Sequence, residues 1–241
     1  MTLEALRTSG RLLVKRTPWL YSTHYYLRLL AGAPRRLHLC GKGVNLCVEG
    51  YPSSGNSFAV TLLRRLNPDV RVSSHFHSVA NVKLAIKHHI PVVILLRKPL
   101  DTLASRIVRF GASPLPAVLE YLDFHGHIMQ SASRHRFCFV TFESLTKRPG
   151  PTVDQIAAFS NFHFPHGDEA SMQAISADVL VEMEDLFNSW GRQHLQRGLP
   201  SSEKDQRKDQ VKQLLIGMPQ WNEVTTLYRA IEQEAHRQNV V

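Results

Sequence analysis

Hydrophobic residues in this chain gather in short runs, separated by longer stretches with helical period. Continuous apolar or β-branched runs predict buried strands at 46–48, 70–76, 91–96 and 137–142. Between and after them, apolar positions three and four apart predict helices at 56–66, 78–88, 99–110, 114–133 and 152–159. Helices are also predicted at 1–32, 169–187, 203–216 and 222–238, with a flexible break at 198–202.

Strands that alternate with helices are typical of right-handed βαβ units. The predicted fold class is therefore α/β, a three-layer α/β/α arrangement around a central, mainly parallel sheet. A chain of 241 residues is long enough for one large domain of this kind. We expect a single domain over 1–241, with an N-terminal helical segment at 1–42, an α/β core at 43–160 and a helical C-terminal part at 161–241.

The stretch at 46–66 combines a short strand, a loop of small residues and the start of a helix. Such a unit binds anions, because free backbone N–H groups and the positive end of the helix dipole face one point. Residues 50–57 fit the phosphate-loop pattern G-x-x-x-x-G-K-[ST], except that Asn56 stands in place of the lysine. That replacement disfavours an ordinary ATPase or GTPase. A plain turn between a strand and a helix is the alternative interpretation.

Charged and titratable residues follow two of the other predicted strands. His75 lies in the last residues of the predicted strand at 70–76, and Arg97 comes directly after the strand at 91–96. In parallel sheets, ligands bind beyond the carboxyl ends of the strands. We therefore expect the loop at 50–57, His75 and Arg97 to lie at one edge of the sheet.

The formal charge of +9 and a pI near 9.7 indicate anionic ligands, a membrane surface or nucleic acid. Nucleic acid is disfavoured, because the chain has no RNA-binding signature, zinc-finger spacing or basic heptad. Three cysteines form no CxxC pair, and no signal-peptide pattern or membrane-length apolar run is present. We expect a reduced, cytoplasmic protein.

Three separated segments resemble one family, the PAPS-dependent sulfotransferases, which use 3′-phosphoadenosine 5′-phosphosulfate as the sulfuryl donor. Residues 51–58 (YPSSGNSF) resemble its 5′-phosphosulfate loop, and residues 96–105 (LRKPLDTLAS) resemble its 3′-phosphate motif. The stretch Val140–Leu145, Pro149 and the residues Ile-Ala-Ala-Phe at 156–159 resemble its Y-E-D-L…P…I-A-x-F-L stretch. The resemblance covers roughly 46–160 in the family's order and spacing. It implies a P-loop NTPase-like sulfotransferase fold.

The resemblance also implies site residues and a reaction. PAPS would be the co-substrate, PAP the product, and no metal is required. Arg97, with a guanidinium suited to phosphate, and Ser105 would bind the 3′-phosphate, and Phe58 would stack on the adenine. The full predicted nucleotide-binding set is Ser53, Ser54, Gly55, Asn56, Ser57, Phe58, Arg97, Ser105 and Arg197. His75 would be the general base that takes the proton of the acceptor, with His77 as the next candidate.

The chain departs from the family at two lysine positions. Ser53 stands where the family usually has a lysine or arginine that stabilises charge on the leaving phosphate and the migrating sulfuryl group, and Ser73 replaces a second lysine. Another cation would have to reach the site. The candidates are Lys42, Lys83, Lys98 and Arg197, with Lys204, Arg207 and Lys208 in reserve.

Three functions are therefore weighed. The first is a sulfotransferase acting on a hydroxyl or amine of a small-molecule, lipid or carbohydrate acceptor. The second is a non-catalytic member of the family that binds PAP or PAPS, which the missing lysines would explain. The third is a small-molecule kinase, against which Asn56 and the lack of a magnesium-binding acidic strand end both count. The aromatic, arginine-rich segment 1–32 is expected to pack on the core, with peripheral membrane contact as the alternative.

Overall fold

The computed structural model describes residues 3–32, 37–189 and 202–239. Within these residues a four-stranded sheet has the order β2-β1-β3-β4, and every neighbouring pair of strands is parallel. The strands are β1 (Leu46–Gly50), β2 (Val72–Ser74), β3 (Val92–Leu96) and β4 (Cys138–Thr141). The predicted parallel sheet is confirmed. The strand at 70–76 is shorter than predicted, because β2 is an edge strand that pairs with β1 only from Val72 to Ser74.

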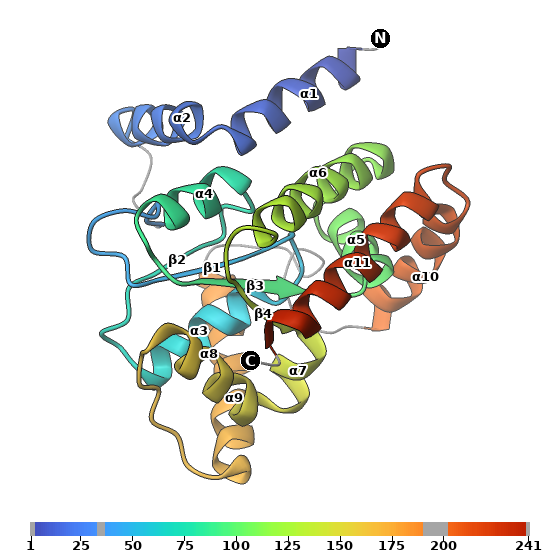
Figure 1. Cartoon of the computed structure of the whole chain (residues 1–241). Helices are drawn as coiled ribbons and strands as arrows, with labels where there is room; N and C mark the ends of the chain where they lie inside the picture. The colour runs from blue at the N-terminus through green and yellow to red at the C-terminus, as the bar shows by residue number, and fades with distance from the viewer. Residues whose placement is uncertain (1–2, 33–36, 190–201, 240–241) are drawn as a thin grey trace.

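Helices cover both faces of the sheet, which confirms the predicted three layers (Figure 1). Successive residues of β3 point to opposite faces. Ile94 packs in a cluster with α4 (Val79–Lys87), α5 (Pro99–Phe110), α6 (Pro114–Ala132), α10 (Ser202–Ile216) and α11 (Trp221–Asn239). Val93 and Leu95 pack in a second cluster with α3 (Asn56–Leu66), α8 (Pro149–Ser160) and α9 (Glu169–Ser189). All five residues of β3 are buried, as expected for a strand covered on both faces.

One short helix was not predicted from the sequence. Helix α7 (Phe142–Lys147) begins directly after β4, and the hydroxyl of Thr141 accepts a hydrogen bond from the Ser144 N–H at 3.0 Å. This bond satisfies one of the N–H groups that a helix start leaves without a partner. Of the predicted break at 198–202, residues 198–201 lie outside the described part of the chain.

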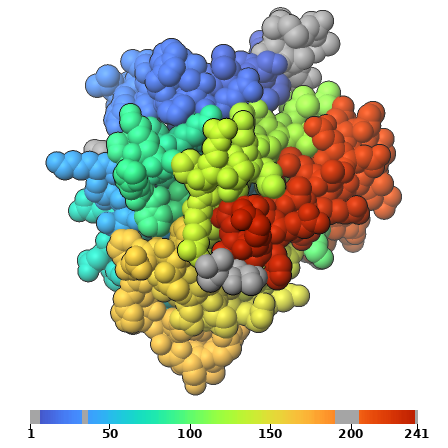
Figure 2. Space-filling view, in the orientation of Figure 1, coloured from blue at the N-terminus to red at the C-terminus, as the bar shows by residue number. Residues whose placement is uncertain are grey.

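Two N-terminal helices, α1 (Leu3–Arg16) and α2 (Pro18–Leu30), lie over α4, and α1 also contacts α6 (Figure 1). In the space-filling view they form the blue layer above the green α4 and α6 region (Figure 2). Helix α2 buries none of its residues fully and exposes Trp19, Tyr26, Leu27 and Leu30. No helix in the described part of the chain is long and apolar enough to cross a membrane.

Candidate functional site

The order of the strands places a topological switch point between β1 and β3. The chain leaves β1 toward β2 on one side, and it leaves β3 toward β4 on the other. The loops that follow β1 and β3 therefore diverge, and in open α/β sheets ligands bind at such a point. The loop at 51–55 follows β1, the turn at 75–77 follows β2 and Arg97 follows β3, so all three lie at the carboxyl ends of neighbouring parallel strands. The sequence prediction that brought them to one edge of the sheet is confirmed.

Two glycines fix the path of the loop between β1 and α3. A Cβ atom at Gly50 would lie 2.7 Å from the carbonyl oxygen of Leu95, so β3 leaves room only for glycine. Gly55 has a φ of 95° and caps α3 with no side-chain hydrogen bond. The first N–H groups of α3 therefore remain directed toward the loop, where the positive end of the helix dipole also lies.

The loop side chains divide into two sets. The hydroxyl of Ser54, 1% exposed, lies 3.4 Å from that of Thr102 on α5, and Asn56, 4% exposed, donates to the carbonyl of Tyr51 at 3.3 Å. Both hold the loop from inside. Ser53, Gly55 and Ser57 are only partly buried. Of the two hydroxyls predicted to bind the 5′-phosphosulfate, that of Ser54 belongs to a buried residue and that of Ser57 to a partly exposed one.

Three other predicted nucleotide contacts lie apart from this set. Phe58 is 6% exposed and packs in the apolar core beneath α3, which leaves little ring face for an adenine. Its stacking role stays a prediction that this burial disfavours. Ser105 is buried on α5, one helical turn beyond Thr102, which ties that helix to the loop by donating to the Pro52 carbonyl at 3.0 Å. Arg197 lies outside the described residues.

Two arginines converge on Ser53. Arg97 donates to the Ser53 carbonyl at 2.8 Å and stacks over the ring of Phe142 with its Cζ atom 4.1 Å from the centroid. Arg109, from the last turn of α5, donates to the Ser53 hydroxyl at 3.2 Å. Burial lowers the pKa of Arg97, but a guanidinium still remains charged near neutral pH. Sequence reasoning found Arg97 and missed Arg109.

The backbone at these positions is held in unusual conformations. Ser53, His75 and His77 have φ values of 75°, 68° and 47°, a region that residues other than glycine adopt uncommonly. The buried carboxylate of Glu49 accepts hydrogen bonds from the N–H groups of Phe76 and His77 at 3.2 and 2.9 Å. Strain of this kind persists only where the surroundings fix it, and it concentrates at functional sites. Glu49 on β1 thus fixes the turn that carries both histidines.

His75 and His77 have different surroundings. Nε2 of His75 lies 3.0 Å from the hydroxyl of Ser57, at the first turn of α3. Nδ1 of His77 lies 2.7 Å from the carbonyl oxygen of Gly50, which can only accept, so this nitrogen carries the proton. Burial, reinforced by the nearby His75, lowers the pKa of His77 to about 3. His77 is a neutral support of the loop, and His75 is the imidazole that faces the phosphate-loop helix.

Two of the cations proposed from sequence to replace the missing lysines have other positions. Lys83 donates to the carbonyl of Arg16 at 3.1 Å and so ties α4 to the N-terminal helices. Lys98 is exposed at the start of α5. At the second lysine position, the buried hydroxyl of Ser73 accepts a hydrogen bond from the side-chain amide of Asn81 at 3.0 Å. Besides Arg97, the cation that contacts the substituted loop position is Arg109, through the hydroxyl of Ser53.

Comparisons with known proteins give a limited picture. No protein-family model matches this sequence, and no curated protein matches it significantly. Solved structures do resemble it, among them the crystal structure of mouse sulfotransferase SULT7A1 complexed with PAP. The two chains are 11% identical, the match covers 78% of this chain and 90% of that one, and the TM-score is 0.46.

Proposed function

We propose that this chain is a PAPS-dependent sulfotransferase, which moves a sulfuryl group from PAPS to a hydroxyl or amine acceptor and releases PAP. The observation that carries the proposal is the convergence of Arg97 and Arg109 on Ser53, beside the uncapped start of α3. Two guanidinium groups and a helix N-terminus at one loop form a strongly anion-selective place. The motif resemblance at 51–58 and 96–105 supports a phosphosulfate nucleotide as that anion.

The residues present fit the two anionic ends of PAPS. The N–H groups at the start of α3 and the hydroxyl of Ser57 would hold the 5′-phosphosulfate. Arg97 and Ser105 would hold the 3′-phosphate, with the guanidinium leaving its present acceptor, the Ser53 carbonyl, to bind it. The small residues of the loop would let its backbone N–H groups approach the nucleotide closely. Gly50 already lets the loop start close against β3.

When bound, PAPS supplies the sulfuryl group: a bond forms between the acceptor oxygen or nitrogen and sulfur while the bond from sulfur to the phosphate oxygen breaks. His75 would accept the proton that the acceptor loses, since its Nε2 lies at the start of α3 beside Ser57. Arg109 would stabilise the charge that collects on the leaving phosphate. It would thereby take over the role of the lysine or arginine that the family usually has at the position of Ser53.

The same geometry weighs on the two other functions. A small-molecule kinase needs a phosphate-loop lysine, whereas the side chain of Asn56 is buried and donates to the carbonyl of Tyr51. A non-catalytic nucleotide-binding role was suggested by the loss of both lysines. Arg109 restores a cation at the first of these positions, which favours catalysis over binding alone.

The test is thermal unfolding of the purified protein with PAP and, separately, with ATP plus Mg²⁺. A ligand that binds only the folded state raises the midpoint temperature of unfolding. At a ligand concentration a hundredfold above Kd, the free energy of unfolding rises by about 2.7 kcal/mol. We expect a clear rise with PAP alone. A rise only with ATP and Mg²⁺ would favour the kinase, and no rise with either would reject nucleotide binding. PAP binding without transfer from radiolabelled PAPS to any acceptor would favour the non-catalytic role.

A further inference from the structure

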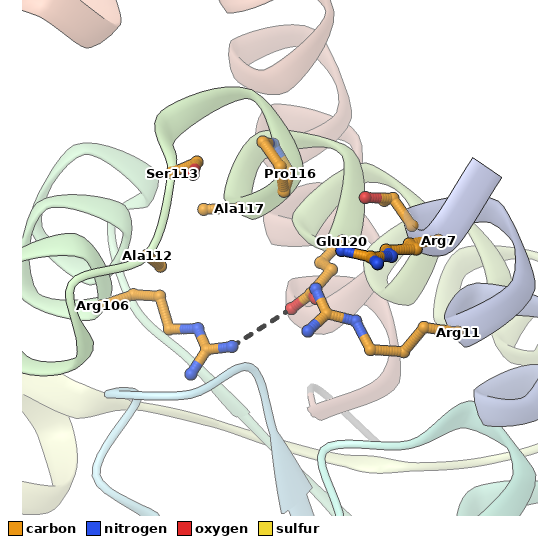
Figure 3. A pocket seen from close by; sticks show the side chains of 9 residues that line it. Arg7, Arg11, Arg106, Ala112, Ser113, Pro116, Ala117 and Glu120 are labelled. Atoms are coloured by element: carbon orange, nitrogen blue, oxygen red, sulfur yellow. Dashed lines mark hydrogen bonds and ion pairs between the residues drawn. The ribbon is translucent and has the colours of Figure 1, made fainter. Parts of the chain in front are cut away.

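A cavity of about 290 Å³ lies between α1, α6 and the end of α5 (Figure 3). Arg7 and Arg11 reach it from α1, Arg106 reaches it from α5 on the opposite side, and Glu120 points into it from α6. Ligand pockets for small molecules have volumes of roughly 300–1,000 Å³. The cavity is therefore large enough for one sugar ring or a compound of similar size.

The walls of this cavity carry an excess of positive charge. Glu120 is 4% exposed and forms ion pairs with Arg11 and with Arg106, the latter at 3.4 Å. Three arginines against one carboxylate leave two positive charges uncompensated. Arg7 is exposed and forms no hydrogen bond or ion pair with any residue in the described part of the chain. This guanidinium is therefore available to an anion in the cavity.

The effect of this charge reaches beyond the cavity. Burial lowers the pKa of Lys15 to about 8, and the positive charges of Arg106 and Arg11 add to the effect. A lysine loses its proton more readily where neighbouring charges are positive. Arg106 and Arg11 therefore act on Lys15, which is outside the lining of this cavity, while Glu49 and Asp123 shift its pKa in the opposite direction.

The cavity adjoins that loop. The hydroxyl of Tyr51 donates to the carbonyl of Ala117, which lines the cavity, at 2.8 Å. A second, smaller cavity lies against Pro52 and His77 and shares Glu120 with the first. The cationic cavity is thus separated from the phosphate loop and its histidine turn by one layer of side chains.

We infer that this cavity binds an acidic group, a carboxylate or a phosphate, on the acceptor whose hydroxyl receives the sulfuryl group. The inference rests on the proposed function for the transfer step, but the anion site itself does not. Arg7 and Arg106 would hold the acidic group from opposite sides, while Glu120 remains paired with Arg11. Charge-assisted hydrogen bonds from guanidinium groups are strong and suit both kinds of oxyanion. Neutral acceptors of the same size would lose them.

The experiment is a ligand-observed NMR titration of the full chain at low salt, with saturating PAP to occupy the phosphate loop. The probes are two matched pairs, glucuronate with glucose and glycerol 3-phosphate with glycerol, which separate carboxylate from phosphate sources. We expect at least one acidic compound to bind about tenfold more tightly than its neutral partner. Radiolabelled PAPS then tests whether that compound is sulfated.

The variants separate the cavity from the rest of the surface. Arg7→Gln should weaken binding of the acidic compound roughly threefold and Arg106→Gln roughly tenfold, while Arg134→Gln, at an exposed arginine in the turn after α6, should change nothing. PAP affinity should be the same in wild type and Arg7→Gln. If PAP binds but acidic and neutral partners bind equally, the cavity inference fails alone. If the acidic compounds depend on Arg7 but PAP never binds, the acceptor role is overturned together with the proposed function.

Discussion

The phosphate loop and the α1–α6 cavity each contain two arginines that interact with other side chains or with the backbone, and the partners differ in charge. At the phosphate loop, Arg97 and Arg109 donate to the carbonyl and the hydroxyl of Ser53, which are neutral. In the α1–α6 cavity, Arg11 and Arg106 pair with the buried carboxylate of Glu120. Helix α5 supplies one member of each group, Arg109 and Arg106.

The difference separates two uses of the same side chain. A guanidinium that donates to neutral oxygens can exchange them for an incoming phosphate without exposing a buried charge. A guanidinium that pairs with a buried carboxylate also stabilises the fold, because removing either partner leaves the other charge desolvated. We therefore expect changes at the loop to alter binding and rate, and changes at Glu120 to alter stability.

The largest effect should come from His75, because neither group of arginines can accept a proton. His75→Ala should lower the rate of sulfuryl transfer about a hundredfold to ten-thousandfold, since general bases contribute that much, while PAP affinity stays unchanged. The assay is transfer from radiolabelled PAPS, with calorimetry for PAP. His77→Ala removes a hydrogen bond to the Gly50 carbonyl and should lower the rate less than His75→Ala does. If His75→Ala retains full transfer, His75 is not the base.

Arg109 should affect the rate more than binding. Arg109→Gln should lower the transfer rate about a hundredfold, the usual loss when one donor to a developing charge is removed. Arg109→Lys keeps the positive charge and should recover part of the rate. Steady-state kinetics with both variants measure this. Equal rates for wild type and Arg109→Gln would mean that the cation at Ser53 takes no part in transfer.

Arg97 should affect nucleotide binding. Arg97→Ala should weaken PAP binding roughly thirtyfold, about 2 kcal/mol, because a hydrogen bond to a charged group contributes that much. Calorimetric titration with PAP gives the affinity, and urea unfolding checks that the variant is folded. Lys98→Ala, at the exposed neighbouring position, is the control and should bind PAP normally. Unchanged PAP affinity in Arg97→Ala contradicts its assignment to the 3′-phosphate.

Glu120 should show the opposite pattern. Glu120→Gln removes the buried negative charge from two arginines and should destabilise the fold by about 1–2 kcal/mol, less than a fully buried pair would lose because Arg11 is half exposed. Urea unfolding measures this. The same change makes the cavity more positive, so acidic compounds should bind more tightly. A variant that is as stable as wild type would show that the pair contributes nothing to the fold.

The sequence predicted the parts of the site that depend on local pattern. The apolar run at 46–48, the glycines at 50 and 55 and the helix after them are consecutive in the chain, so strand, loop and helix could be read directly. Arg97 was found for the same reason, because it follows the most continuous apolar strand. Parallel pairing then places both at the same edge of the sheet.

The contacts that were missed depend on packing between distant segments. Arg109 lies 56 residues from Ser53 in the chain, and the hydrogen bonds of Thr102 help to hold its helix against the loop. The pairing of Arg11 with Glu120 spans 109 residues and depends on how α1 lies over α6. The burial of Phe58 likewise follows from the packing of α3 on the sheet. The two arginine contacts leave no periodic or motif signal in the sequence, whereas Phe58 belongs to the apolar stripe of its helix with Leu62 and Leu66.

The smallest effect on stability should come from His125 on α6, whose ring lies beside Tyr51 of the loop after β1. His125 is 1% exposed, its ring lies 4.0 Å from that of Tyr121, and burial lowers its pKa to about 4. The unfolded chain binds a proton near pH 6.5 and the folded chain does not, so stability is lost as the pH falls from about 6.5 toward 4. His77 acts in the same direction, whereas Glu49, whose pKa burial raises to about 8, acts in the opposite one.

His125→Phe isolates this contribution, because it keeps an aromatic ring and removes the titrating group. Between about pH 7 and pH 5.5, wild type should lose about 1 kcal/mol more stability than the variant, since one proton is taken up by the unfolded state over most of that interval. Glu49 and His77 are common to both proteins, so their effects cancel in the difference. Urea unfolding at the two pH values measures it. Equal losses would mean that His125 is protonated in the folded state, and that the packing between Tyr51 and α6 tolerates a charge.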